Sequence, residues 1–202
     1  MMPHDTDTLP SQPTSDSIPR VIVLMGVSGS GKTTLGMRVA ETLGVSFIEG
    51  DSLHPSSNVS KMRAGIPLND DDRAPWLAAL GVALRDATQR QGCAVAACSA
   101  LKRTYRDLLR SLAGDVYFVA LGAETATLQR RLGERRHAYM PASLLQSQLN
   151  TFEPLQDDEA GTSIGVDGAL DMSLSAILRA IVRDQARPYP VMPGELNNPD
   201  LS

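Results

Sequence analysis

The chain lacks an excess of positive charge and any long apolar run, and both absences limit its partners. Its formal net charge is −4 at pH 7. No dense basic patch appears, which argues against a nucleic-acid partner. No stretch is long and apolar enough to cross a bilayer. The first residues are polar and acidic without an apolar segment, so we expect no secretory signal and no membrane partner. Small molecules are the expected partners.

Cysteine is also scarce. The chain has two cysteines, Cys93 and Cys98, and both fall on one predicted strand. Side chains five residues apart on a strand point to opposite faces, so the two thiols are not expected to form a disulfide. A chain without disulfides suits a reducing compartment, and we expect a cytoplasmic protein.

One folded domain accounts for most of the sequence. The chain has 202 residues, 42% of them hydrophobic, which suffices for one sizeable core. Trp76, the only tryptophan, is expected to anchor that core. Residues 1–19 are rich in Ser, Thr, Pro and Asp and are predicted to form a disordered tail. Residues 187–202 carry four prolines and are predicted to form an extended tail, which leaves 20–186 for the domain.

Apolar runs alternate with amphipathic stretches along this domain. Such alternation is typical of an α/β fold in which helices cover both faces of a parallel sheet. The predicted strands are 21–25, 45–48, 94–98, 116–121 and 162–166. The predicted helices are 33–43, 73–90, 103–112, 124–136, 142–152 and 174–184, with a short one near 57–65.

The run from Gly26 to Thr33 reads GVSGSGKT and matches the P-loop pattern G-x-x-x-x-G-K-[ST]. It follows the first predicted strand and opens a helix, which is the context a phosphate-binding loop needs. Its backbone N–H groups and the helix N-terminus would face phosphate oxygens. Lys32 would reach the β- and γ-phosphates, and the Thr33 hydroxyl would bind Mg²⁺. The sequence therefore predicts a nucleoside triphosphate site made of Gly26, Val27, Ser28, Gly29, Ser30, Gly31, Lys32, Thr33 and Thr34.

Two further absences narrow the class of P-loop protein. No N-K-x-D motif is present to read a guanine base, and the third predicted strand ends without the carboxylate that motor and transporter ATPases place there. The second strand is instead followed by Glu49 and Asp51. Ligands of open α/β sheets bind beyond the carboxyl ends of the strands. We therefore assign Glu49 to the Mg²⁺ shell and Asp51 to the base or orienting group for an acceptor hydroxyl, although a loop Asp is often only a turn or cap residue.

Four segments in this order resemble the gluconokinases of the small P-loop kinase type, relatives of shikimate kinase and the nucleoside-monophosphate kinases. They read GVSGSGKTT, GDSLHPSSNVSKMRAGIPLNDDDRAPWL, CSALKRTYRDLLR and YMPASLLQSQLNTFEP, and the resemblance spans about residues 20–159. It implies a three-layer P-loop NTPase fold with a five-stranded parallel sheet and a mobile lid at about 131–153. It also implies a homodimer that uses ATP and Mg²⁺ to phosphorylate D-gluconate at its 6-hydroxyl.

Five further side chains are candidates for contact with the acceptor. His54 could hydrogen-bond a sugar hydroxyl or carboxylate, or could pack as an ordinary histidine. Lys61 lies on the short predicted helix, and Arg73 follows an Asp-rich stretch that caps the next helix. Lys102 and Arg106 follow the third strand, at the same edge as the P-loop. A cation near the acceptor would bind a sugar-acid carboxylate, whereas a solvated helix face is the alternative.

A basic amphipathic segment, residues 130–137, is expected in the lid. Arg131 and Arg135 are four residues apart, so one helical face carries both. By resemblance, Arg131 would lie near the adenine or phosphates and Arg135 near the γ-phosphate, where it would take part in catalysis. The sequence reads RRHAYM from Arg135 onward and so departs from the R-x-G-H pattern common in the family. A solvated basic helix is the alternative.

Two other functions stay open on the sequence alone. Another small hydroxy acid, such as shikimate, could be the acceptor, although the segment Leu53-His54-Pro55 favours gluconate. A non-catalytic nucleotide-binding regulatory protein would keep the P-loop. It would have no need for the carboxylates that follow the second strand.

Overall fold

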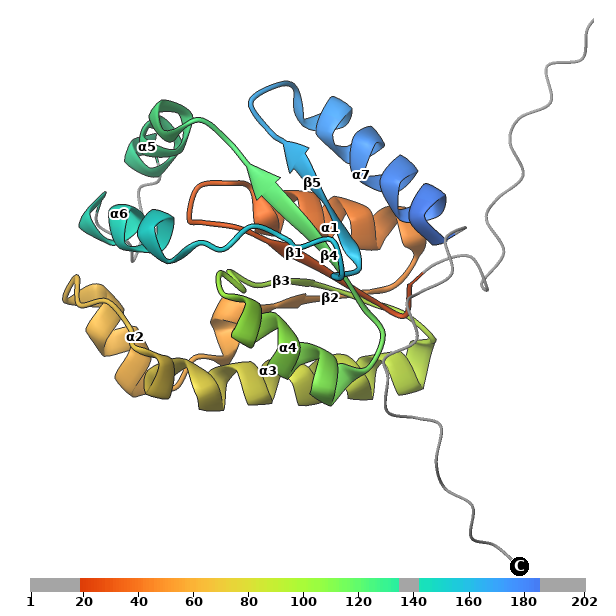
Figure 1. Cartoon of the computed structure of the whole chain (residues 1–202), viewed down its shortest axis with the longest axis horizontal. Helices are drawn as coiled ribbons and strands as arrows, with labels where there is room; N and C mark the ends of the chain where they lie inside the picture. The colour runs from red at the N-terminus through yellow and green to blue at the C-terminus, as the bar shows by residue number, and fades with distance from the viewer. Residues whose placement is uncertain (1–18, 135–141, 186–202) are drawn as a thin grey trace, which may run out of the picture.

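Five strands form one parallel sheet within the part of the chain that the computed structural model describes, residues 19–134 and 142–185 (Figure 1). The strand order is β2-β3-β1-β4-β5, and every neighbouring pair is parallel. The predicted strand bounds differ from the observed ones by no more than one residue at either end. The observed bounds are Val21–Met25 (β1), Ser46–Glu49 (β2), Ala94–Ala97 (β3), Val116–Gly122 (β4) and Gly161–Gly165 (β5).

Helices cover both faces of the sheet, which confirms the predicted α/β fold (Figure 1). One face carries α1 (Lys32–Leu43) and α7 (Leu170–Gln185), which contact each other. The other face carries α3 (Asp70–Gln91) and α4 (Arg103–Ala113). None of the helices in the described residues is long and apolar enough to span a membrane.

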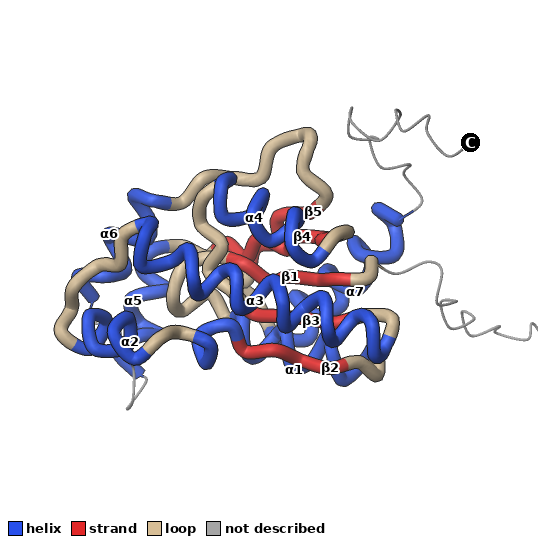
Figure 2. The backbone as a smooth tube through the Cα atoms, turned by 90° about the horizontal axis from the view of Figure 1, so that it is seen from below, coloured by secondary structure: helices blue, strands red, loops and turns tan. Residues whose placement is uncertain are grey.

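The shorter helices gather at one end of the sheet. These are α2 (Ser56–Arg63), α5 (Thr125–Glu134) and α6 (Ala142–Thr151), as Figures 1 and 2 show from two directions. A 3₁₀ turn, η2 (Gly50–Leu53), directly follows β2 and leads toward α2. The lid residues 135–141 and the tail residues 1–18 and 186–202 fall outside the described residues.

The first strand shows why the sequence specifies a sheet covered on both faces. All five of its residues are fully buried. Val21, Val23 and Met25 join the core beneath α3 and α4, whereas Ile22 and Leu24 join the core beneath α1 and α7. A strand buried on both faces reads as a continuous apolar run, which is what residues 21–25 do. Trp76 belongs to the α3 side and is 1% exposed, which confirms its predicted role as a core anchor.

The start of α3 differs from the prediction by three residues because a capping box fixes it. The Asn69 side chain accepts a hydrogen bond from the Asp72 backbone N–H at 2.8 Å, and the Asp72 carboxylate accepts one from the Asn69 N–H at 3.1 Å. Two otherwise unpaired N–H groups are thereby satisfied. The acidic residues of the first turn also favour the positive end of the helix dipole. This cap places Arg73 in the first turn, next to the loop that leads from α2.

Alanine at Gly81, in the middle of α3, should destabilise the fold. A Cβ there would lie 2.7 Å from Leu112 Cβ and 2.9 Å from Leu112 Cδ1, on α4. Overpacking of this kind costs about 1–3 kcal/mol, which exceeds the gain of about 1 kcal/mol that alanine brings to an ordinary helix position. Urea unfolding should therefore show a lower free energy of unfolding for Gly81→Ala.

Gly133→Ala, in α5, is the matched control, because its added Cβ meets no atom of the described residues within 4 Å, apart from its chain neighbours and its own helix backbone. This variant should be neutral or slightly stabilised. Equal effects of the two substitutions would contradict close packing between α3 and α4.

Candidate active site

The loop from Gly26 to Gly31 folds back on itself before α1 begins. Gly26, Gly29 and Gly31 have φ values of 138°, 85° and 90°, which residues with a side chain rarely adopt. A Cβ at Gly26 would also lie 2.7 Å from the Leu121 carbonyl oxygen. The Lys32 ammonium donates to the Val27 carbonyl oxygen at 3.1 Å, across the loop. The resulting concave backbone at a helix N-terminus is suited to bind an anion.

A cavity of about 360 Å³ opens on the α7 side of this loop. Its wall includes Gly29, Gly31, Thr34 and Arg131. The Arg131 guanidinium donates to the Val166 carbonyl oxygen at 2.6 Å and more weakly to the Gly29 carbonyl oxygen at 3.4 Å. The structure thus brings Arg131 beside the P-loop, as predicted, while its contact with a nucleotide stays a prediction.

Ser30 provides a test of whether phosphate fits this loop. Its hydroxyl is buried and has no hydrogen-bond partner among the described residues, although the residue lines the cavity. An unpaired buried hydroxyl costs about 1–3 kcal/mol. A bound phosphate oxygen would supply the missing partner, so the loop fits a phosphate-bearing ligand.

Thr33 and Glu49 lie together at the base of the P-loop. The Thr33 hydroxyl donates to Glu49 Oε2 at 2.6 Å, and Glu49 also accepts from the Asp51 backbone N–H at 3.5 Å. Hydroxyl and carboxylate oxygens are the hard ligands that Mg²⁺ prefers. No group of three or more acidic, His or Cys side chains suited to a metal occurs among the described residues. The pair therefore fits a Mg²⁺ ion that takes few protein ligands and completes its shell with water and phosphate.

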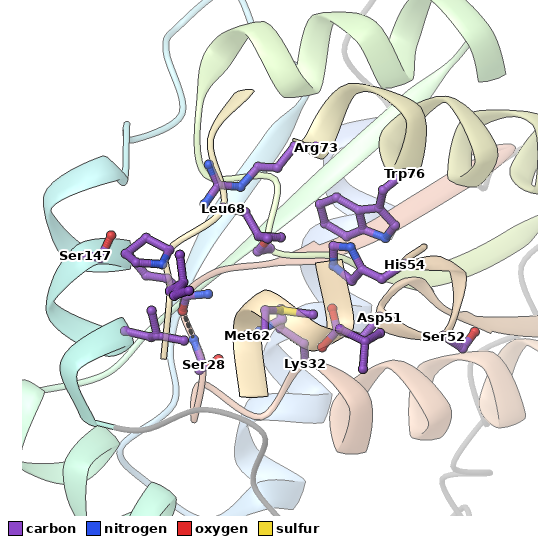
Figure 3. A pocket seen from close by; sticks show the side chains of 16 residues that line it. Ser28, Lys32, Asp51, Ser52, His54, Met62, Leu68, Arg73, Trp76 and Ser147 are labelled. Atoms are coloured by element: carbon purple, nitrogen blue, oxygen red, sulfur yellow. Dashed lines mark hydrogen bonds between the residues drawn. The ribbon is translucent and has the colours of Figure 1, made fainter. Parts of the chain in front are cut away.

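A second cavity, of about 410 Å³, lies on the other side of the P-loop (Figure 3). We call it the acceptor cavity. Figure 3 shows that the side chains of Lys32, Asp51, His54 and Arg73 surround it. They come from α1, from the turn η2 and its C-cap, and from α3. The remaining lining residues are Ser28, Ser52, Val59, Met62, Ile66, Pro67, Leu68, Trp76, Ser99, Leu144, Ser147 and Gln148.

His54 is held in one orientation at the wall of the acceptor cavity. Its ring stacks on Trp76 with centroids 4.0 Å apart, and Trp76 Nε1 donates to the Gly50 carbonyl oxygen at 2.7 Å. The Asn58 amide nitrogen donates to the Asp72 carbonyl oxygen at 2.7 Å, which fixes the orientation of that amide, and it lies 3.3 Å from His54 Nδ1. Nδ1 therefore accepts, and the imidazole proton lies on Nε2.

Of the cations predicted to contact the acceptor, Arg73 is the one that lines the acceptor cavity. Its side chain is 13% exposed, and its guanidinium donates to the Tyr105 hydroxyl at 3.1 Å. The Tyr105 hydroxyl in turn donates to Asp70. These contacts hold a planar donor group at the cavity wall, where it could pair with an acceptor carboxylate.

The two lysines predicted to contact the acceptor, Lys61 and Lys102, do not line the acceptor cavity. Lys61 pairs with Asp72 at 2.6 Å and so links α2 to α3. Lys102 pairs with Asp70 at 2.7 Å and lines a shallow depression beside Arg73. Hydrogen bonds from these two lysines lower the pKa of their Asp partners. The predicted contact of Lys61 with an acceptor thus lacks support in this structure, whereas Lys102 lies next to the cavity.

Helix α6 brings residues into the cavity that the sequence analysis did not single out. Leu144, Ser147 and Gln148 line it, and the Gln148 side-chain oxygen accepts from the Ser28 backbone N–H at 2.7 Å. The spacing of these three residues is the signal that could have found them, because positions three and four apart share one helical face. Arg135, predicted near the γ-phosphate, lies outside the described residues.

Comparison with known proteins identifies the family. A family described as an AAA domain matches residues 21–155. A gluconokinase of Gluconobacter oxydans is 47% identical over 161 residues, which cover 80% of this chain and 90% of that protein. A thermosensitive gluconokinase of Escherichia coli is 44% identical, covering 68% of this chain and 73% of that protein. The chain belongs to the gluconokinase family.

Solved structures agree with this membership of the gluconokinase family. A gluconokinase from Sinorhizobium meliloti superposes with a TM-score of 0.71 at 45% identity, covering 84% of this chain and 93% of that one. An unliganded sugar kinase from Janibacter superposes with a TM-score of 0.75 at 39% identity, covering 82% of this chain and 98% of that one. The predicted fold and family are both confirmed.

The prediction that Arg106 contacts the acceptor of this gluconokinase-family chain is wrong. Arg106 is fully buried, and its guanidinium pairs with Glu159 through two hydrogen bonds of 2.7 Å. It also donates to the carbonyl oxygens of residues 100, 101, 153 and 154. Burial would raise the pKa of Glu159, but hydrogen bonds from Arg106 hold that pKa below its ordinary value. No donor is left for a substrate, because the side chain joins the β3–α4 loop to the segment after α6.

Removal of the Arg106 guanidinium should destabilise this gluconokinase-family fold strongly. Arg106→Ala leaves the buried Glu159 carboxylate with the Gln156 N–H and with Arg103 and Arg110 only at 3.8 Å, and breaking a buried pair costs up to about 3–5 kcal/mol. Thermal and urea unfolding would measure the loss.

Arg85→Ala is the control, because Arg85 is exposed and reaches Asp86 only at 3.8 Å. An exposed pair of this kind contributes about 0–1 kcal/mol. A loss at Arg106 no larger than that at Arg85 would contradict the structural role assigned to Arg106.

His54 should make the folded state less stable in acid. Burial is the main cause that lowers the pKa of His54 below 6.5; Asp51 acts against it, and Arg73 adds to it. Below about pH 6.5 the unfolded chain binds a proton that the folded His54 does not, so the free energy of unfolding falls as pH falls. Between pH 7.5 and pH 5, the free energy of unfolding of the wild type should therefore fall more than that of His54→Gln. A difference independent of pH, or an NMR titration of His54 at or above its ordinary pKa, would refute this.

Proposed function

We propose that this chain transfers the γ-phosphoryl group of ATP to the 6-hydroxyl of D-gluconate and so forms 6-phospho-D-gluconate. One observation carries the proposal. The P-loop residues Ser28 and Lys32 line the same cavity as Asp51 and Arg73, so a small acceptor in that cavity lies at the phosphate end of a bound nucleotide. The names of the relatives, gluconokinases at 44–47% identity, support gluconate as the acceptor.

The nucleotide and its metal are assigned to the P-loop side. The Gly26 and Ser28 N–H groups already donate to Ser99 and Gln148, so the N–H groups from Gly29 onward and the Lys32 ammonium would neutralise the phosphate oxygens. Thr33 and Glu49, whose oxygens lie 2.6 Å apart, are the side chains that would hold Mg²⁺. When bound, Mg²⁺ supplies positive charge against the β- and γ-phosphates. Arg131 would approach the nucleotide from the rim, next to Gly29.

Phosphoryl transfer then needs an oriented hydroxyl. Asp51 lines the acceptor cavity together with Lys32, so its carboxylate can accept the proton of the acceptor hydroxyl as that oxygen bonds to the γ-phosphorus. The bond from the γ-phosphorus to the bridging oxygen breaks in line, and ADP leaves with that oxygen. Catalysis comes mostly from positioning and charge neutralisation, because direct transfer between two oxygens leaves the protein little covalent chemistry to do.

Recognition of a sugar acid is assigned to Arg73 and His54, which line the acceptor cavity. The Arg73 guanidinium, held by Tyr105 at 3.1 Å, would pair with the carboxylate, and such a charge-assisted contact contributes about 1.5–3 kcal/mol. His54 Nε2–H is a donor for a hydroxyl. The lid, with Arg135, would close over the phosphates and exclude water. A homodimer in the cytoplasm completes the proposal, on family resemblance alone.

Coupled ADP release across a panel of acceptors tests this function. The panel contains gluconate, shikimate, glycerate, gluconolactone, glucose and nucleoside monophosphates, each with Mg²⁺ and ATP. We expect turnover on gluconate, and turnover on another acceptor in its place would correct the substrate. ADP release that no acceptor stimulates would instead support the non-catalytic regulatory protein.

The same assay tests the assigned roles of two residues. Asp51→Asn should lower kcat by about 10²- to 10⁴-fold, because the acceptor hydroxyl loses its proton acceptor. Lys32→Ala should abolish turnover, because the phosphates lose their mobile cation. Asp86→Asn is the matched control: it lies on α3, 16 residues and hence about 24 Å beyond Asp70 along the helix, and should keep wild-type rates. Wild-type activity of Asp51→Asn would remove Asp51 from the chemistry.

A further inference from the structure

Gln148, on α6, contacts the P-loop from the side of the acceptor cavity. Its Oε1 accepts a hydrogen bond of 2.7 Å from the Ser28 backbone N–H, although the two residues are 120 positions apart in the chain. Figure 3 marks this bond with a dashed line beside Ser28. Both Gln148 and Ser28 line that cavity. The side chain therefore lies where a P-loop residue and an acceptor would meet.

The bond to Ser28 also fixes which end of the amide faces the cavity. A backbone N–H can only donate, so the Gln148 oxygen must face Ser28 and the Nε2 group must lie on the other side of the carboxamide. No hydrogen-bond acceptor for Nε2 is present among the described residues. Gln148 is half-buried, and an amide nitrogen at a cavity wall whose N–H groups have no acceptor among the described residues is suited to bind a ligand oxygen.

Gln146 shows the contrast on the same helix. It is exposed, and its Nε2 donates to the Asn150 side-chain oxygen, four residues along α6, at 2.8 Å. This is the ordinary behaviour of a glutamine on a helix surface. Within the described part of the chain, the Gln148 side chain instead makes one hydrogen bond, to a distant loop, and leaves its donors at the acceptor cavity.

We propose that Gln148 binds the acceptor, with its carboxamide held by the Ser28 N–H and its Nε2 donating to hydroxyl oxygens of the polyhydroxy acid. This inference rests on the proposed function, because it takes the cavity to be the acceptor site. The contact selects for an acceptor with a hydroxyl at that position, since an analogue without it leaves the amide donors unpaired. It also joins α6, which lies within the predicted lid at about 131–153, to both the acceptor and the P-loop.

The alternative role for this contact is purely structural, in which Gln148 only braces the P-loop. The two roles differ in what they change. A brace acts on nucleotide binding and on fold stability, so its loss would raise the KM for ATP. An acceptor contact acts on gluconate and on one of its hydroxyls.

Gln148→Leu and Gln148→Glu separate these roles, with Gln146→Leu and Gln146→Glu as matched controls. Leu removes both hydrogen bonds, whereas Glu keeps an oxygen for Ser28 but has no donor. Loss of one hydrogen bond corresponds to about 3- to 10-fold in kcat/KM for gluconate. We expect at least this loss in both Gln148 variants, with the KM for ATP within about twofold of the wild type, and no loss in either Gln146 variant.

Gluconates that each lack one hydroxyl provide the sharper measurement. The wild type should lose kcat/KM on the analogue that lacks the contacted hydroxyl, and Gln148→Leu should show no further loss on that same analogue. Equal penalties in the wild type and the variant on every analogue would overturn the inference, as would an increase confined to the KM for ATP.

The wild type in this assay distinguishes the two levels of failure. If it turns over gluconate but Gln148 fails the tests above, the inference fails and the proposed function stands. If it turns over no acceptor, the proposed function fails and the inference falls with it. Thermal unfolding of each variant shows whether it is folded. If Gln148→Leu does not fold, Gln148→Glu provides the test in its place.

Discussion

The hydrogen bond between Thr33 and Glu49 is the contact on which the site depends. It joins the first turn of α1, which closes the P-loop, to the end of β2, where the turn with Asp51 begins. The same carboxylate accepts from the Asp51 N–H and so caps that turn. The Glu49 side chain thus contacts both the start of α1 and the turn that carries Asp51. The phosphate site and the proposed base therefore have a fixed separation. A site for phosphoryl transfer needs this fixed geometry more than it needs reactive groups, because the protein contributes chiefly position and charge.

A buried ion pair provides the corresponding link on the other side of the cavity. Arg106 and Glu159 hold the segment after α6 against the loop after β3, and the Glu153 N–H donates to the Leu101 carbonyl oxygen in the same region at 2.8 Å. Helix α6 leads into this anchored segment and carries Gln148 to the P-loop. The acceptor cavity thus lies between two rigid attachments. Its α6 wall is set by contacts that lie outside the cavity itself.

The secondary structure could be predicted well from the sequence, whereas the long-range contacts of individual side chains could not. The strands were placed within one residue because apolar runs such as 21–25 report burial on both faces directly. The P-loop was recognisable because its function depends on local backbone, which local sequence specifies. Arg106 was misjudged for the opposite reason: its partner, Glu159, is 53 residues away, and nothing in the local pattern distinguishes a buried arginine from a substrate-binding one. Gln148 was missed because its contact with Ser28 spans 120 residues, although its helical face was readable from the spacing.

The central claim is that the acceptor cavity presents the primary hydroxyl of gluconate to the γ-phosphate. Phosphorus NMR of the product made from ATP and gluconate tests it most directly. We expect a single new phosphomonoester whose phosphorus couples to the methylene protons of carbon 6. A phosphorus coupled to a single proton would place the phosphate on a secondary hydroxyl, and release of inorganic phosphate alone would show that no acceptor is used. Either result would contradict transfer to the 6-hydroxyl of gluconate.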